Sequence, residues 1–140
     1  MRLLIPILAM LMLFSCKQKS TSTASAAKGY TIPDSLINKR GVFFNRNVVD
    51  MGVLQRGIPV MSKVIMFNHS NNQLQLEEPS TTCGCTTAKT SKKVVEPGDT
   101  CMVYISYDSK IPGIFSKDVY INFPGQLDVL RIEVKGHVEF

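Results

Sequence analysis

Short apolar runs separated by turn residues fill the sequence after residue 41, and this pattern constrains the fold more than any other feature. In the clearest run, residues 130–138, apolar and polar side chains alternate. The apolar positions are Leu130, Ile132, Val134 and Val138. Alternation with a period of two is typical of a strand with one buried and one solvated face. No stretch after residue 41 has convincing helical periodicity, so the sequence predicts an all-β domain.

Other segments show the same strand signals. Further strands are expected at 42–44, 59–67, 74–76, 101–107 and 115–123. Inward side chains are expected at Cys101, Val103, Ile105, Tyr107, Phe115, Val119 and Ile121. The sequence Glu96-Pro97-Gly98-Asp99 predicts a β-turn, because Pro presets the second position and Gly accepts a positive φ at the third. Gly136 falls on the apolar side of its strand and predicts a bulge or a close backbone approach.

About seven short strands in a hundred residues, with turns at near-regular intervals, predict an immunoglobulin-like β-sandwich over residues 41–140. A small barrel is the alternative. The whole chain has 140 residues and a hydrophobic fraction of 44%, which fits one domain with a modest core. A domain of this size needs no metal or other cofactor to fold, and none is expected.

The start of the chain reads as a secretory signal. Met1-Arg2 is followed by an apolar run from Leu3 to Phe14, then by Ser15 and Cys16. Twelve helical residues span only about 18 Å, well short of the ~30 Å hydrocarbon layer of a bilayer. Residues 1–15 are therefore expected to be a cleaved signal peptide rather than a membrane-spanning helix.

The sequence Leu13-Phe14-Ser15-Cys16 resembles the lipobox of bacterial lipoproteins. That resemblance implies that Cys16 becomes the acylated N-terminus, which binds membrane lipid. An ordinary signal peptide with an incidental cysteine is the alternative. No acidic run follows Cys16, so a lipid-anchored, periplasm-facing position in the cell envelope is expected, at the outer membrane rather than the inner.

Residues 16–40 are expected to be a flexible basic tether. Small residues dominate from Ser20 to Gly29. Residues 17–40 carry five Lys or Arg and one Asp, whereas residues 41–140 carry ten of each sign. The chain's net charge of +5 thus lies mainly outside the domain. A nucleic-acid module should carry its basic patch on the folded domain, so no nucleic acid is expected as a partner.

Several short motifs recur in an order that resembles an uncharacterised, secreted, immunoglobulin-like bacterial family, distantly similar to Hydin-type domains. They are Asp50-Met51-Gly52-Val53, Gly57, Phe67-Asn68, Cys83-Gly84-Cys85-Thr86, Pro97-Gly98, Gly113 with Phe115, Leu130-Arg131-Ile132 and Gly136-His137-Val138. The resemblance covers residues 43–139. Because the family has no established activity, it implies fold and compartment rather than chemistry.

Three cysteines remain besides Cys16, and thiols outside the cytoplasm tend to be oxidised. The simplest expectation is a disulfide from Cys101 to Cys83 or Cys85, which leaves one thiol free. Alternatively, Cys83 and Cys85 bridge each other across Gly84 in a strained, easily reduced ring. A third interpretation is a Cu(I) or zinc site made by all three thiolates. The one-residue gap is a weak zinc signal.

Other metal ligands are not expected. His69 lies in a polar turn, and His137 lies on the wet face of the last strand. Met51, Met61, Met66 and Met102 could suggest a copper cluster, but Met66 and Met102 fall inside strands, where methionine is commonly core filler.

No pattern indicates an enzyme, because no nucleophile with a base, paired carboxylates or nucleotide loop is recognisable. The prediction is a membrane-anchored, non-enzymatic interaction or scaffold module, with a protein partner that adds to an exposed sheet edge. The alternative is a periplasmic soft-metal-binding or thiol-redox protein that uses the Cys83-Gly84-Cys85 loop.

Overall fold

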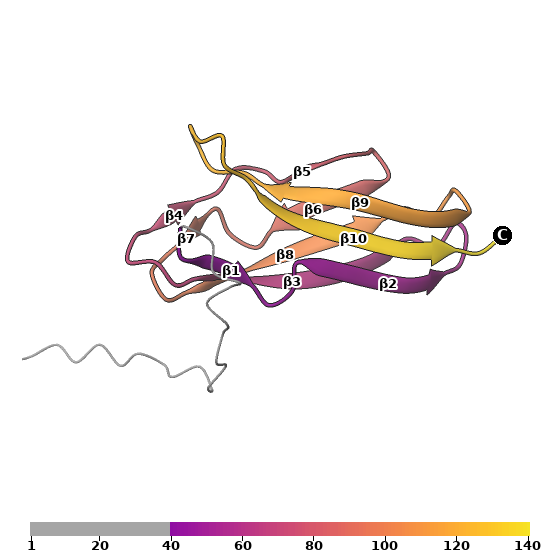
Figure 1. Ribbon diagram of the computed structural model, residues 1–140, viewed down its shortest axis with the longest axis horizontal. Coiled ribbons are helices and arrows are strands. Elements are labelled where there is room, and N and C mark those ends of the chain that lie inside the picture. Colours follow the sequence, from indigo (N-terminus) through magenta and orange to yellow (C-terminus); the bar gives the residue numbers. More distant parts are fainter. Residues whose placement is uncertain (1–39) are drawn as a thin grey trace, which may run out of the picture. The chain divides into compact units, whose positions relative to one another are not determined.

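The computed structural model describes residues 40–140, which form an all-β sandwich (Figure 1). Its strands are β1 (Val42–Phe44), β2 (Val48–Leu54), β3 (Val60–Asn68), β4 (Leu74–Gln75), β5 (Ser80–Thr81), β6 (Thr86–Thr90), β7 (Val94–Val95), β8 (Thr100–Tyr107), β9 (Gly113–Ile121) and β10 (Leu130–Val138). This part of the chain contains no helix, and hence none that could cross a membrane.

Two four-stranded sheets make the two layers. Sheet A has the order β1-β3-β8-β6, and sheet B has the order β2-β10-β9-β5. The short strands β4 and β7 pair separately. In sheet B, β10 lies between β2, with which it runs parallel, and β9, with which it runs antiparallel (Figure 1). The chain changes sheets between β1 and β2, so one continuous segment contributes an edge strand to each layer.

The space between the sheets is filled by the alternate side chains of the long strands. Fully buried residues of sheet A include Val64, Met66, Cys101, Val103 and Ile105, and those of sheet B include Val49, Val119, Ile121, Ile132, Val134 and Val138. All belong to one hydrophobic cluster. Removal of this apolar surface from water is the main favourable term for folding.

The sequence-based fold prediction is confirmed. The molecule is an all-β sandwich, and the side chains of β8, β9 and β10 that were expected to point inward are buried, except for the half-buried Leu130. The β-turn before β8 is also present, with Asp99 N donating to Glu96 O and Gly98 at φ 76°. At Gly136 the β2–β10 register shifts, and an added Cβ would lie 2.7 Å from Cζ of Phe115. Gly136 therefore combines the expected bulge with the expected close approach.

The structure has ten strands in this region, against the expectation of about seven. Three of the ten, β4, β5 and β7, have two residues each. Two longer strands were also not predicted: β2, which forms one edge of sheet B, and β6, which reads Thr-Thr-Ala-Lys-Thr and forms one edge of sheet A. An edge strand with polar side chains lacks the apolar alternation that marks the central strands.

Several predictions fall outside the described residues. These are the signal peptide at 1–15, the lipidated Cys16 and the tether as far as residue 39.

Candidate functional site

The Cys-Gly-Cys segment is the link by which the chain leaves sheet B and enters sheet A. It joins β5 to β6, and hydrogen bonds fix it at both ends. Thr81 Oγ1 donates to the carbonyl oxygens of Cys83 and Thr86, each at 3.0 Å. Asp108 N donates to Cys85 O at 2.8 Å, which ties the segment to the end of β8. The segment therefore has a defined place beside the gap between the two sheets.

Cys83 and Cys85 form a disulfide, with their Cα atoms 5.3 Å apart, and Cys101 is a free, buried thiol. The favoured prediction, a bridge from Cys101 to one of the other two, is wrong. Thr86 pairs with Tyr107 in the β6–β8 ladder, so the Cys-Gly-Cys segment lies at the Tyr107 end of β8. Cys101 lies six residues earlier, about 20 Å away along the strand. A disulfide requires Cα atoms within about 7 Å.

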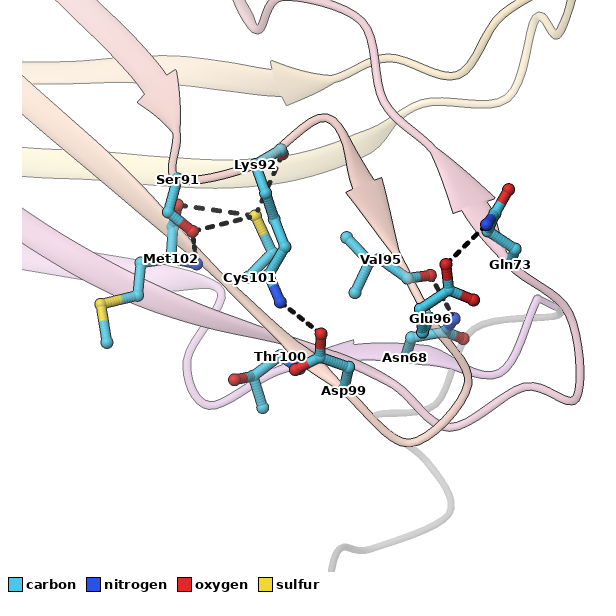
Figure 2. A network of polar contacts seen from close by, with 10 residues as sticks. All are labelled: Asn68, Gln73, Ser91, Lys92, Val95, Glu96, Asp99, Thr100, Cys101 and Met102. Atoms are coloured by element: carbon cyan, nitrogen blue, oxygen red, sulfur yellow. Dashed lines mark hydrogen bonds and ion pairs between the residues drawn. The ribbon is translucent and has the colours of Figure 1, made fainter.

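Figure 2 shows the surroundings of Cys101, which are separate from the Cys-Gly-Cys segment. Its Sγ lies 3.6 Å from Ser91 Oγ and 3.6 Å from the carbonyl oxygen of Lys92. Nearby, Lys92 and Asp99 form an ion pair. The Lys92 ammonium also donates a hydrogen bond to the Asp99 carboxylate. This hydrogen bond, together with a second from Thr100 N, lowers the pKa of Asp99. The thiol is inaccessible to solvent and acts as a part of the core.

The three-thiolate metal site is also wrong for the same geometric reason. Among residues 40–140, no group of three or more His, Cys, Asp or Glu side chains is placed to hold a metal ion. Met66 is fully buried in the core, as expected of filler, and Met61 is 69% exposed. His69 is exposed, and its ring meets Phe43 edge-on.

The edge of β9 is open over half of its length. β9 pairs with β10 from Gly113 to Ile121, but with β5 only at Val119 and Tyr120. Two more contacts end this pairing: Thr82 N donates to Asp118 O, and Asp118 N donates to Thr82 Oγ1, each at 3.1 Å. Beyond it the chain turns away toward Cys83, and Gly113–Lys117 has no strand partner on this side among the described residues.

Alternation along β9 shows which backbone groups the open edge presents. The carbonyl oxygen of Asp118 faces the β5 side, since it accepts from Thr82. In an antiparallel ladder, residues two apart direct their N–H and C=O groups to the same side. Ser116 and Ile114 therefore direct theirs to the open edge, whereas Phe115 and Lys117 bond to β10.

A groove of about 390 Å³ lies beside this edge, between β9 and the end of β8. Its lining includes Cys85 of the disulfide, the rings of Tyr107 and Phe115, and the exposed side chains of Ile111 and Ile114. The Tyr107 and Phe115 rings are stacked, with their centroids 3.8 Å apart. Burial, followed by the nearby Asp108 carboxylate, raises the pKa of Tyr107. The ring pair thus presents a neutral, apolar surface to the groove.

Three charged side chains line the same groove. Lys110 Nζ lies 2.6 Å from Asp108 Oδ2, and this hydrogen bond raises the pKa of Lys110. Lys117, which is half-buried, has no hydrogen bond or ion pair among the described residues. It occupies the inward position of β9 between Phe115 and Val119. Lys117 was not predicted as a site residue, although the alternation of the strand marks it as an inward lysine.

Comparison with known proteins places this domain. The family DUF1573, described as "Protein of unknown function", matches residues 42–138, which is more than half of the chain. The chain belongs to DUF1573. Membership of DUF1573 supports the predicted uncharacterised family and assigns no activity. No curated protein matches the chain.

Several solved structures resemble this DUF1573 domain. A protein of unknown function from Porphyromonas gingivalis W83 has 22% identity and a TM-score of 0.60, over 69% of this chain and 46% of that one. The secreted serine protease VesC from Vibrio cholerae has 14% identity and a TM-score of 0.56, over 73% and 24%. The chain therefore spans less than half the length of either protein.

A human structure also has this fold. The ASH/PapD-like domain of human CEP192 has 16% identity and a TM-score of 0.53, over 81% of this chain and 94% of that one. Similarity at these identities shows the shared β-sandwich fold alone, because one sandwich fold hosts many unrelated functions.

Proposed function

We propose that this DUF1573 chain is a lipid-anchored, periplasm-facing lipoprotein whose β-sandwich is a non-enzymatic interaction module. Its partner adds a strand at the open edge of β9. One observation carries the proposal: Gly113–Lys117 lacks a strand partner among residues 40–140 and borders a groove with exposed isoleucines. An uncovered strand edge offers a row of backbone hydrogen-bonding groups, and partners that bind by strand addition use such a row.

The chemistry of the groove supports binding rather than catalysis. It contains an ion pair, a lysine, two stacked aromatic rings and a disulfide. Covalent catalysis requires an unprotonated nucleophile beside a base, and the raised pKa of Lys110 keeps its amine protonated beside the Asp108 carboxylate.

The anchor is the part of the proposal that rests on sequence alone. We propose acylation of Cys16 and outer-membrane retention, with residues 17–39 as a tether. Mass spectrometry of the mature native chain, together with membrane fractionation, tests it. The expected product begins at an acylated Cys16, and an unacylated chain that retains Met1 would contradict it.

Site-specific photo-crosslinking in intact cells tests the binding mode. A photoreactive residue at Ile114, which is 88% exposed beside the open edge, should capture the partner. The same residue at Val53, 66% exposed on β2 of the same sheet, serves as the control position and should not. Equal capture at both positions would count against a partner at β9.

A second variant pair isolates the backbone contact. Ser116→Pro, introduced alongside the crosslinker, removes an N–H that faces the open edge and should abolish capture at Ile114. Ser116→Ala keeps that N–H and removes only the hydrogen bond from Ser116 Oγ to Glu133 Oε1, so it should leave capture unchanged. Capture that survives the proline variant would show that the partner does not add a strand.

Thiol-redox exchange is the second candidate, because Cys85 lines the groove where a partner would lie. In that case the unpaired Cys85 thiolate of a Cys83→Ser variant should attack a disulfide of the partner and remain joined to it in a mixed disulfide, visible on a non-reducing gel, while the partner's second sulfur leaves as a thiolate. Soft-metal binding by this pair has a separate signature. Stoichiometric copper or zinc that is lost in a Cys83→Ser, Cys85→Ser variant would overturn the interaction module.

A further inference from the structure

Lys117 is an unusual side chain for its position. The inward positions of β9 on either side of it hold Phe115 and Val119, which are 6% and 0% exposed. Lys117 points between the sheets with them, lines the groove, and has no ion pair or hydrogen bond in the part of the chain that the structure describes. An ammonium group partly removed from water gains from a negatively charged neighbour.

The other charges of the groove leave this ammonium group uncompensated. Asp108 is the one acidic residue in the lining, and its carboxylate is held by Lys110 at 2.6 Å. The groove therefore has a net positive charge, centred on Lys117. Beside it, the exposed Ile111 and Ile114 supply apolar surface, and the stacked Tyr107 and Phe115 rings form a buried part of the lining.

A strand added at the open edge of β9 would place its side chains against these groups in a fixed order. Its inward side chains would lie opposite Phe115 and Lys117, with Cβ atoms about 5 Å apart across each pair. Because successive inward positions are two residues apart, the side chain opposite Lys117 and the one opposite Phe115 are separated by one outward residue.

We propose that this groove selects an extended peptide segment of a partner protein that carries Asp or Glu opposite Lys117 and an apolar side chain two positions away, opposite Phe115. The inference rests on the proposed strand addition at β9 and names the partner's chemistry. The carboxylate completes an ion pair with Lys117, and the apolar side chain packs against the apolar lining of the groove beside Phe115.

A second copy of this chain is a poor occupant of the same edge. Pairing of two β9 edges would bring two inward Lys117 side chains into one groove, where like charges repel. An inward lysine on an exposed strand edge also discourages such self-pairing. The partner is therefore a different protein.

Selection from a displayed library of random nine-residue peptides against the full-length chain in detergent tests the inference. Wild-type protein should enrich peptides that contain one Asp or Glu and an apolar residue two positions away from it. Lys117→Glu should shift the preference at that position to Lys or Arg, and Lys117→Gln should remove it. The control Lys135→Glu makes the same charge change on the exposed face of β10 and should leave the selection unchanged.

Affinity measurements on one selected peptide complete the test. Replacement of its acidic residue by the matching amide should weaken binding by about tenfold, because a partly exposed ion pair is worth less than a buried one. The amides of Ile114 and Ser116 should become protected from hydrogen exchange when the peptide binds.

Selected peptides without an acidic preference, or an acidic preference that persists in Lys117→Gln, would overturn the inference. The inference would also be overturned if the Lys117→Gln variant self-associates and the selected peptides show no acidic preference. Lys117 would then serve to prevent self-pairing of the β9 edge. Photo-crosslinking at Ile114 separates this failure from failure of the proposed function. Partner capture at Ile114 without a preference for acidic peptides would still support strand addition at β9.

Discussion

At the scale of single residues, two positions show how tightly the sandwich is packed. The first is Gly136, where the absence of a Cβ lets Phe115 of the neighbouring strand approach. Alternation in the sequence marks Gly136 as an inward position without a side chain, and the Phe115 ring fills the space. The same ring forms part of the groove, so Gly136 helps to position the candidate site.

Gly136→Ala should destabilise the fold. The added Cβ would lie 2.7 Å from Cζ of Phe115 and 3.0 Å from the carbonyl oxygen of Gly52, so the ring or the backbone must move. Such overpacking costs about 1–3 kcal/mol of unfolding free energy, which urea denaturation measures. Gly84→Ala is the matched control, since only open space surrounds its added Cβ beyond its chain neighbours. Equal stability of both variants would contradict the prediction.

The second position is Asn68, a polar side chain that is 1% exposed and fully hydrogen-bonded. Its Nδ2 donates to the carbonyl oxygens of Asn72 at 2.8 Å and Val95 at 3.0 Å (Figure 2 shows the second). Its Oδ1 accepts from Ser70 N at 3.1 Å and from Ser70 Oγ. Asn68 thus joins the end of β3 to β7 and to the following turn.

Asn68→Ala should therefore cost about 2–3 kcal/mol of unfolding free energy, because it leaves the buried carbonyl oxygen of Val95 without this donor. Thermal and urea unfolding measure the loss. Asn71 is an exposed residue of the same turn, so the control Asn71→Ala should change the unfolding free energy by less than about 0.5 kcal/mol. A loss for Asn68→Ala within that control range would show that water replaces the amide.

At the scale of strands and turns, the turn before β8 links sequence, charge and stability. Asp99 follows the predicted Pro97-Gly98 corner, and its carboxylate accepts hydrogen bonds from Lys92 and Thr100 N, which lower its pKa. A carboxyl group with a lowered pKa in the folded state stabilises the fold above its unfolded pKa. That contribution is lost as the pH falls through the lowered folded value.

Asp99→Asn should thus be less stable than wild type at about pH 7, and the difference should shrink below the ordinary Asp value of 3.8. The side chain is 44% exposed, so solvent screening limits the difference to a few tenths of a kcal/mol up to about 1. Urea titrations of both proteins at about pH 7 and about pH 2.5 measure it. A difference that is constant with pH would show that the ion pair is not its cause.

The cysteines on β8 and in the β5–β6 link should react in distinct steps. Cys101 is fully buried and free, so an alkylating reagent should label its peptide only after unfolding. The peptide that contains Cys83 and Cys85 should be labelled only after reduction of the disulfide. Peptide mapping by mass spectrometry follows both. Labelling of Cys83 or Cys85 without reductant would contradict the pairing.

These elements also show which parts of the molecule are readable from sequence. Short apolar runs or alternation identified β1, β3, β4, β8, β9 and β10, because a buried strand face imposes a local pattern, whereas β2 was not identified. The polar edge strand β6 gave no such signal, and the cysteine pairing depends on its register with β8, a contact between distant parts of the chain. The inward Lys117 was readable in principle. The absence of a strand partner for Gly113–Lys117 could not be predicted, because the point at which the chain leaves the β9 edge after β5 depends on the tertiary structure.

At the scale of the whole molecule, the sandwich leaves the β9 edge partly uncovered, since the β5–β6 link crosses between sheets before it reaches the start of β9. The fold thereby places a strand edge, an aromatic surface and a lysine side by side. None of these would be a binding site alone.

Hydrogen exchange should report this uncovered edge directly. The amides of Ile114 and Ser116 face away from β10 and should exchange much faster than those of Phe115 and Lys117, which donate to it. Amide-resolved exchange measured by NMR on the free protein checks this pattern. Uniform protection along Gly113–Lys117 would show that the edge is already occupied.

The position of β10 between β2 and β9 has a consequence for how the protein is made. A chain that emerges N-terminus first, from a ribosome or a translocation pore, produces β2, β5 and β9 before the strand that joins β2 to the other two. Sheet B lacks the strand that connects β2 to β9 until residues 130–138 have emerged. Folding of sheet B must therefore wait until β10 has emerged, and until then the interior residues of sheet B remain available to chaperones.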